Sequence, residues 1–291
     1  MSTSGVPGRR PSSLERDERW ARVAWAFLAE PRETSVVAAL GTFGAVEALA
    51  RFRAGHLLVR PGALERLPLL DVDDLAHAAD RQGVHVVVPG DEGWPLGVDR
   101  LDEPPYALFV RGYPDLDTLV ERSVAVVGSR AATDYGMRTA ADLAEGLGAR
   151  GFTIISGAAY GIDSAAHRAA LASGGPTVAV LACGADRFYP AAHRSMLNEI
   201  ARTGAVVSEV PVGAAPYRSR FLARNRLIAT LARATIVVEA SQRSGSLTTA
   251  RHARENHLPV GAVPGPVTSM ASAGCHALIR EAEAVLVTGA G

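Results

Sequence analysis

The chain has 291 residues, of which 48% are hydrophobic, and a formal net charge of zero. This length can bury a sizeable core or two domains, and the apolar runs are too short for a transmembrane helix. The two cysteines and eight histidines show no metal-ligand spacing, so we expect no metal site and a reducing, cytoplasmic location.

The first part of the chain predicts a leader and a small helical domain. Residues 1–18 are expected to be a disordered leader, because they are polar and lack the apolar stretch of a signal peptide. Apolar positions recur at helical spacing between residues 20 and 53, and an acidic helix follows at 61–82. Residues 19–82 are therefore the predicted helical domain. Within it, residues 40–44 resemble a helix-hairpin-helix turn, which sometimes contacts DNA but is more often a packing module.

Residues 83–291 predict an α/β fold. Short apolar strands alternate with helix-like segments, which is typical of a parallel sheet covered by helices on both faces. Residues 89–114 are rich in Pro, Gly and Asp and are expected to be a connecting wrap. The predicted strands are 84–88, 124–127, 153–155, 178–181, 205–208, 236–238, 260–263 and 285–287. The predicted helices are 135–149, 162–173, 192–203, 221–233, 247–257 and 275–283.

Charge is spread unevenly along the chain. Residues 61–121 carry 13 acidic and 4 basic side chains, whereas residues 213–256 carry 8 arginines against Glu239 and Glu255. All 30 basic residues are arginine. Genome composition explains most of this bias, but arginine also binds phosphate bidentately and stacks on bases. The basic stripe is thus compatible with a nucleic-acid partner.

Three turns of small residues each follow a predicted strand and precede a predicted helix. At the carboxyl ends of parallel strands, such turns let backbone amides approach an anion. The first turn is not a dinucleotide fingerprint, because Thr133 replaces the third glycine and no acidic ribose ligand follows. A phosphate-binding loop with lysine is excluded by the absence of lysine. The candidate ligand-binding residues in the turns are Gly128, Ser129, Arg130, Ser156, Gly157, Tyr160, Gly161, Ser244, Gly245 and Ser246.

Asp163 and His167 lie one helical turn apart at the start of the predicted helix 162–173. They can be an acid/base pair, or a cap and a local hydrogen bond that hold the preceding loop in shape. We favour the second interpretation, because no nucleophile with an adjacent base is evident.

A third group of candidates lies on the predicted helix 221–233, which carries Arg224, Asn225 and Arg226. A solvated cationic face is the usual meaning of such a run. Here the N-terminus of the helix points at the ligand edge of the sheet, which favours phosphate contact.

The ordered motifs of the chain resemble those of the DNA-processing protein A family, called DprA or Smf. The motifs are Val-Ala-Val-Val-Gly-Ser-Arg130, Ser-Gly-x-Ala-x-Gly-Ile-Asp163, Ala-His167, Ser-Glu209, Phe-x-x-Arg-Asn-Arg226, Val-Glu-Ala240, Ser-Gly-Ser-Leu-x-Thr-Ala250 and Val-Pro-Gly265. The resemblance implies an extended Rossmann domain behind a small helical domain of the sterile-alpha-motif kind. It also implies a homodimer that binds single-stranded DNA without sequence preference and loads RecA recombinase in natural transformation.

By the same resemblance, Arg130 and the set Arg224, Asn225 and Arg226 line the DNA pocket, and the turn amides support phosphate. Two departures stand out. Tyr160 occupies a position where many members have lysine, so we expect it to stack on a base. The sequence also stops at Gly291, where many members continue into a winged helix, so no duplex contact by that module is expected.

Two alternatives to a non-enzymatic DNA binder remain open. One is a nucleotide hydrolase of the phosphoribohydrolase kind, and the other is a small-nucleotide sensor. The hydrolases carry a Pro-Gly-Gly-x-Gly-Thr loop, which the nearest stretch here, residues 263–266, lacks. We therefore expect no enzymatic activity, no cofactor and no membrane partner.

Overall fold

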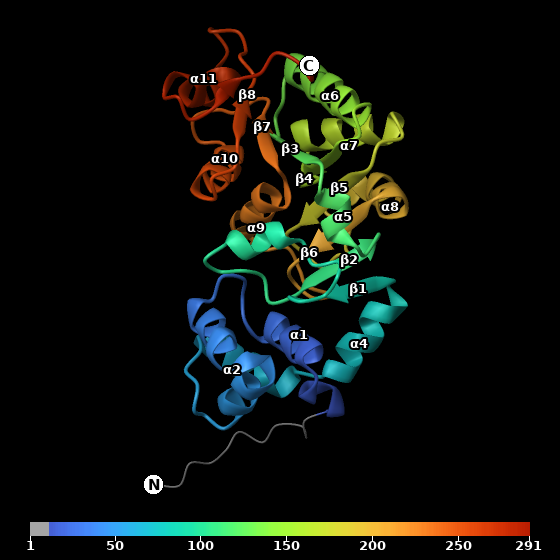
Figure 1. Cartoon of the computed structure of the whole chain (residues 1–291), viewed down its shortest axis with the longest axis vertical. Coiled ribbons are helices and arrows are strands. Elements are labelled where there is room, and N and C mark those ends of the chain that lie inside the picture. The colour runs from blue at the N-terminus through green and yellow to red at the C-terminus, as the bar shows by residue number, and fades with distance from the viewer. Residues whose placement is uncertain (1–11) are drawn as a thin grey trace.

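The computed structural model describes residues 12–291, and Figure 1 shows a helical part beside a long sheet flanked by helices. Most of the predicted leader lies outside the described residues. From Ser12 onward the chain is folded, with a short 3-10 helix at Ser13–Arg16. The buried Glu15 pairs with Arg53 at 2.8 Å. Ordered structure thus begins before the expected boundary at residue 18, because a capping box at Ser12 and this ion pair anchor the segment.

The helical part begins with α1 and a kinked α2. In α2 the backbone turns at Gly44, which has φ of 75°. The Glu18 carboxylate accepts hydrogen bonds from the amides of Ala45 and Val46, so it caps the second half of α2 from inside the chain. The helices of this part are α1 (Glu18–Leu28), α2 (Thr34–Arg53), α3 (Pro61–Arg66) and α4 (Val72–Arg81).

Among residues 12–291, α2 is the one helix with the length and hydropathy of a membrane span, although the sequence predicts none. The kink interrupts it, and its inner side packs on α1, where the Trp25 and Phe52 rings lie 5.5 Å apart. The Trp25 indole also donates to the Ala45 carbonyl at 3.2 Å. These contacts place the inner side of α2 in the core of the helical part.

The sheet has nine strands in the described residues, in the order β1-β2-β6-β5-β4-β3-β7-β8-β9. The two pairings of β2 are antiparallel, and all other pairings are parallel, which confirms the predicted α/β class. The strands are β1 (Val84–Val87), β2 (Leu108–Gly112), β3 (Ser123–Val127), β4 (Thr153–Ser156), β5 (Thr177–Leu181), β6 (Ala205–Ser208), β7 (Ala234–Val237), β8 (Val260–Ala262) and β9 (Val285–Leu286).

Strand β2 was not predicted, because residues 89–114 were interpreted as a wrap. Within that range Phe109 and Val110 are buried between β1 and β6. Pro104 and Pro105, just before the strand, supplied the loop signal and masked a short apolar run. The rest of the wrap includes a 3-10 helix at Leu96–Arg100.

Helices cover both faces of the sheet, as side-chain alternation along β3 requires. Val124 and Val126 share a core with α6 and α7, while Ala125 and Val127 share one with α9 and α10. The helices around the sheet are α5 (Leu116–Val120), α6 (Asp134–Gly148), α7 (Ile162–Ala172), α8 (Arg194–Thr203), α9 (Arg218–Leu231), α10 (Ser246–Glu255) and α11 (Ala273–Arg280).

The strand order reverses at β3. From β3 the chain runs outward through β4, β5 and β6, and then returns to place β7 on the other side of β3. In parallel sheets, ligands bind outside the carboxyl ends of the strands at such a reversal. The turns that follow β3 and β7 are therefore the expected ligand-binding positions of this fold.

Candidate nucleic-acid interface

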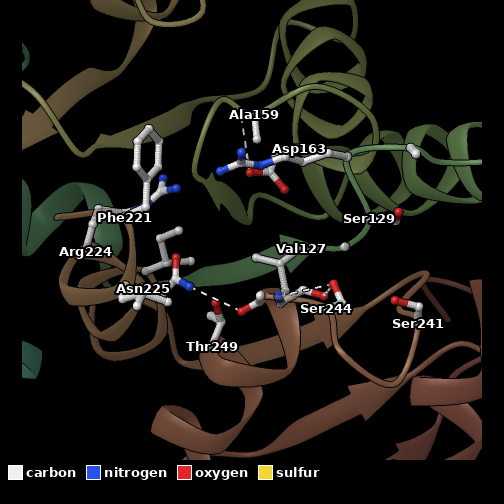
Figure 2. A pocket seen from close by; sticks show the side chains of 17 residues that line it. Val127, Ser129, Ala159, Asp163, Phe221, Arg224, Asn225, Ser241, Ser244 and Thr249 are labelled. Atoms are coloured by element: carbon white, nitrogen blue, oxygen red, sulfur yellow. Dashed lines mark hydrogen bonds between the residues drawn. The ribbon is translucent and has the colours of Figure 1, made fainter. Parts of the chain in front are cut away.

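A pocket of about 390 Å³ lies at this reversal (Figure 2). Figure 2 shows Ala159 and Asp163 on one side, Ser244 and Thr249 on the other, and Phe221 at one end. The structure thus brings the first turn, the third turn and α9 together around one cavity. The predicted residues that line it are Gly128, Ser129, Arg130, Asp163, Arg224, Asn225, Ser244, Gly245 and Ser246.

The first turn places a free cation at the pocket. The Ser129 amide donates to the Glu239 carbonyl at 2.7 Å, which fixes the turn to the end of β7. Glycine is required at residue 128, because a Cβ there would lie 2.8 Å from that same carbonyl oxygen. Arg130 is exposed, and its guanidinium lies 5.2 Å from the ring centre of Phe221. It makes no ion pair with any described residue, so its charge is available to a ligand.

The N-terminus of α6, which follows the first turn, is already occupied by an anion. The Glu239 carboxylate accepts hydrogen bonds from the Thr133 amide at 2.9 Å and from the Thr133 hydroxyl at 2.5 Å. Glu239 is 1% exposed. In dinucleotide-binding proteins a pyrophosphate occupies this place. Here an internal carboxylate fills it, which agrees with the absence of a dinucleotide fingerprint.

The second turn is likewise closed from within. The Asp163 carboxylate accepts hydrogen bonds from the amides of Gly157 at 3.2 Å and Ala159 at 3.3 Å. The buried Ser156 hydroxyl donates to the Val126 carbonyl at 2.7 Å. The resemblance implied that the groups at Ser156 and Gly157 contact phosphate. In the structure, however, the Ser156 hydroxyl is bound to β3 and the Gly157 amide is bound to Asp163.

Burial shifts the pKa values of Asp163 and His167, the two ionisable residues that support the second turn. It raises the pKa of Asp163, while the Arg224 charge and the loop hydrogen bonds act in the opposite direction. His167 is fully buried, with Nδ1 2.7 Å from the Thr177 hydroxyl, and burial lowers its pKa to about 3. No hydrogen bond joins Asp163 to His167 in the described structure. The two residues hold the fold of the loop and its supporting helix, and their geometry is not that of an acid/base pair.

The third turn remains open. The hydroxyls of Ser244 and Ser246 lie 2.7 Å apart, and the Asn225 amide donates to the Gly245 carbonyl at 3.2 Å. The helix that follows, α10, has no side-chain cap and no acidic residue in its first turn. A Cβ at Gly245 would meet nothing within 4 Å. Its first amides bond to groups of the turn itself, Ser246 to the Ser244 hydroxyl at 3.4 Å and Leu247 to the Ser244 carbonyl at 3.2 Å. No carboxylate of the described residues binds this helix N-terminus, so of the three turns this one can still attract an external anion with its positive end.

The arginines of α9 do not act alike. Arg224 is 4% exposed and donates to the Val180 carbonyl, so it forms part of the pocket wall without being free. Burial lowers its pKa to about 10, an effect that Asp163 opposes and Arg130 strengthens. Arg226 is 1% exposed and pairs with Glu209, and it lines no part of the pocket. Its predicted DNA contact finds no support, because residues two apart on a helix point in different directions.

A second pocket of about 360 Å³ adjoins the first and shares Arg130, Ala159 and Phe221 with it. Tyr160, 51% exposed, lines this pocket, and its ring meets the His193 ring edge-on at 4.9 Å. The sequence did not identify Tyr189 and Phe221, whose rings lie 5.4 Å apart here. Phe221 opens the Phe-x-x-Arg-Asn-Arg motif, which was a usable signal, whereas nothing marked Tyr189. Gly157 lines this pocket too, and Ser156 and Gly161 line neither.

No group of three or more His, Cys, Asp or Glu side chains between residues 12 and 291 is arranged to hold a metal ion. Cys183 and Cys275 are free and buried, and burial raises the pKa of each thiol to about 11. The two pockets therefore offer guanidinium, amide, hydroxyl and aromatic groups to a ligand.

Known proteins share both the sequence and the fold. Residues 85–291 match the DNA recombination-mediator protein A family. A putative DNA processing protein DprA of Mycobacterium tuberculosis is 47% identical over 283 residues, covering 91% of this chain and 72% of that protein. Protein Smf of Escherichia coli is 43% identical over 206 residues, covering 70% and 54% of the two chains.

Two solved structures extend the comparison. DprA of Streptococcus pneumoniae superposes with a TM-score of 0.79 at 33% identity, covering 94% of this chain and 95% of that one. DNA processing protein A of Helicobacter pylori, described by its single-stranded DNA binding mode, superposes with a TM-score of 0.64 at 30% identity. That match covers 72% of this chain and 94% of the other. The DprA/Smf resemblance of the sequence is thereby confirmed.

Proposed function

Because this chain belongs to the DNA recombination-mediator protein A family, we propose that it binds single-stranded DNA without sequence preference and delivers RecA recombinase to it. The observation that carries the proposal is the position of Arg130. Its unpaired guanidinium lies at the boundary between an open helix N-terminus and an aromatic pocket. Phosphate and base of one nucleotide strand therefore find complementary groups side by side.

The first pocket, hereafter called the polar pocket, suits a phosphodiester. Arg130 supplies the charge, the positive end of α10 adds a favourable field, and Ser244 and Ser246 supply hydroxyls. These groups recognise phosphate oxygens and read no base edge, so binding is expected to be independent of sequence.

The second pocket, called the aromatic pocket because Tyr160, Tyr189 and Phe221 line it, suits an unpaired base. Tyr160 and Tyr189 are exposed at 51% and 42%, and both are held by edge or tilted contacts that leave ring surface accessible. Base–aromatic stacking is tolerant of sequence and requires an unstacked strand. This favours single strands over duplex.

We also propose that the protein acts without chemistry of its own. The candidate acid/base residues, Asp163 and His167, are buried and engaged in the fold. The role with RecA rests on the recombination-mediator family, and a cytoplasmic location follows from that partner. The proposed homodimer would hold one strand in two such sites, so that two weak contacts reinforce each other.

The binding proposal is tested with a fluorescent single-stranded oligonucleotide titrated at several salt concentrations, beside a duplex of equal length. Single-strand affinity should be higher and should fall with a log–log slope of about −0.7 per phosphate neutralised. Equal affinity for duplex, or affinity that is flat in salt, would contradict it. Hydrolysis of nucleoside monophosphates tests the enzymatic alternative, and titration with mononucleotides tests the sensor.

The RecA role needs a separate experiment. Strand exchange by the host's RecA on DNA coated with single-strand-binding protein should accelerate when this protein is added. Light scattering on the same preparation reports whether it is dimeric. A dimeric, DNA-binding preparation that leaves strand exchange unchanged would refute the loading role and leave a generic binder.

A further inference from the structure

Helix α9 borders both pockets, yet its first turn is poorly suited to begin a helix. Tyr217 occupies the N-cap position without a side-chain hydrogen bond, and the first turn contains no acidic residue. It contains Arg218 and Arg220 instead. A helix N-terminus favours negative charge and a capping oxygen, so this start is intrinsically weak.

The helical part of the chain supplies the missing negative charge. Glu30, in the connection between α1 and α2, accepts hydrogen bonds from Nε of Arg220 at 2.8 Å and from Nη2 of Arg220 at 2.9 Å. Arg66 donates to the same carboxylate at 2.6 Å. Burial alone would raise the pKa of Glu30, but the hydrogen bonds from Arg220 and Arg66 hold it below the ordinary value. Glu30 therefore stays ionised at neutral pH.

Arg220 is fixed by more than this pair. Its Nη1 donates to the Ala215 carbonyl at 2.8 Å, and its guanidinium lies 4.8 Å from the ring centre of Tyr217. It is 9% exposed. The bidentate bond to Glu30 thus joins the approach to α9, the first turn of α9 and the helical part of the chain at one point.

The residue after Arg220 is Phe221, which lines both pockets and lies under the Arg130 guanidinium. Displacement of the first turn of α9 would therefore displace the wall between the pockets. The second half of α9 has its own anchor, the buried pair of Arg226 with Glu209. A loss of Glu30 should consequently act on the start of the helix and leave the rest in place.

We infer that Glu30 is a positioning residue for the DNA site, through which the helical part of the chain controls DNA affinity without touching DNA. This inference rests on the proposed DNA binding. It assigns the helical part a role at the site other than the direct contact that a helix-hairpin-helix turn would make. The predicted turn at residues 40–44 leads into the Ala45 amide, which the Glu18 carboxylate already caps.

The test compares Glu30→Gln with the wild-type full chain in single-stranded DNA titrations and in hydrogen–deuterium exchange. We expect affinity to fall about tenfold, which corresponds to about 1.4 kcal/mol. We expect faster exchange confined to residues 218–222, with the helical part unchanged. A double variant with Arg220→Gln should bind no more weakly than the weaker of the two single variants, because both remove one interaction.

A matched control separates this effect from general destabilisation. Glu103→Gln breaks the exposed Arg32–Glu103 pair, which lies at 3.1 Å and also ties the α1–α2 connection to the rest of the chain. This variant should keep wild-type affinity. Wild-type affinity in Glu30→Gln, or exchange that rises throughout the helical part, would overturn the inference. Failure of the wild-type protein to bind DNA would instead overturn the proposed function. The exchange data would still test whether Glu30 holds the first turn of α9 in place.

Discussion

The turns after β3 and β4 differ from the turn before α10 in where their amides find partners. Glu239 and Asp163, both buried, satisfy the first two turns from inside the chain. The amides that follow the third turn bond only to hydroxyl and carbonyl groups of the turn itself, no carboxylate of the described residues binds them, and the turn faces open space at Gly245. In sequence the three turns look equivalent. Their functional difference depends on two carboxylates that come from elsewhere in the chain or from the next helix.

The contrast separates scaffold from ligand site. A turn closed by a buried carboxylate is rigid and has no capacity left for phosphate, whereas an open helix N-terminus retains that capacity. Substitutions that disturb the backbone of the closed turns should therefore change stability, whereas substitutions around the open turn, or of the exposed side chains Arg130 and Tyr160, should change binding.

The largest effect is expected from matched glycine substitutions in the two kinds of turn. Gly161 has φ of 77°, and a Cβ there would lie 2.2 Å from the Ser129 carbonyl oxygen. Gly161→Ala should lower the free energy of unfolding by about 2–5 kcal/mol through backbone strain and overpacking. Gly245→Ala, which meets no neighbour, should leave it unchanged. Urea unfolding measures both, and equal losses would remove the distinction between closed and open turns.

Arg130→Ala should weaken single-stranded DNA binding by about 1.5–3 kcal/mol, the range for one charge-assisted hydrogen bond to phosphate. Thermal stability should not change, because Arg130 is exposed. Fluorescence anisotropy measures the affinity. Arg168→Ala removes an exposed arginine that lines neither pocket and should bind normally. Unaltered binding by a folded Arg130→Ala protein would remove the first turn from the site.

The closed second turn should also make the protein sensitive to acid. The pKa of His167 is about 3 when folded, against about 6.5 when unfolded, because burial and the nearby His193 and Arg224 disfavour its charge. Below about pH 6.5 the unfolded state binds a proton that the native state does not bind, so the free energy of unfolding falls as pH falls. The expected loss is about 2 kcal/mol by about pH 5. Urea unfolding at several pH values should show a flatter profile for His167→Gln, and an unchanged profile would exclude His167 as the cause.

The smallest effect is expected at Tyr160, which is half exposed. Tyr160→Ala should lose about 1 kcal/mol of DNA affinity, the low end of the range for one base–aromatic stack. Tyr160→Phe should keep most of the affinity, because the ring remains. If both variants bind equally weakly, the hydroxyl is the contact and stacking is not.

Much of the fold followed from local pattern. The seven strands β3 to β9 lie within a residue or two of their predicted ranges. For the inner strands the reason is that a strand buried on both faces is a continuous apolar run bounded by turn residues. Strand β2 escaped prediction, since it is short and follows Pro104-Pro105. Its antiparallel pairing with β1 and β6 depends on tertiary contacts that no local window contains.

The site was less predictable than the fold. The motifs located Arg130 and the third turn, but spacing on α9 could not say that Arg224 lies in the pocket wall while Arg226 lies in an ion pair with Glu209. That outcome depends on a partner residue that follows β6, 17 residues earlier in the chain. The closing of the first turn by Glu239 is similarly a contact across 106 residues. Sequence pattern identifies candidate donors, and long-range packing decides which remain free.

Glu239 acts as a permanent internal competitor for the place that a free dinucleotide would seek. A soluble cofactor with a pyrophosphate would have to displace a buried carboxylate that the Thr133 amide and hydroxyl already hold. A polymer does not face this barrier, because it can engage Arg130, the start of α10 and the aromatic pocket through successive nucleotides. We therefore expect this nucleotide-binding fold to bind a strand in preference to a dinucleotide cofactor.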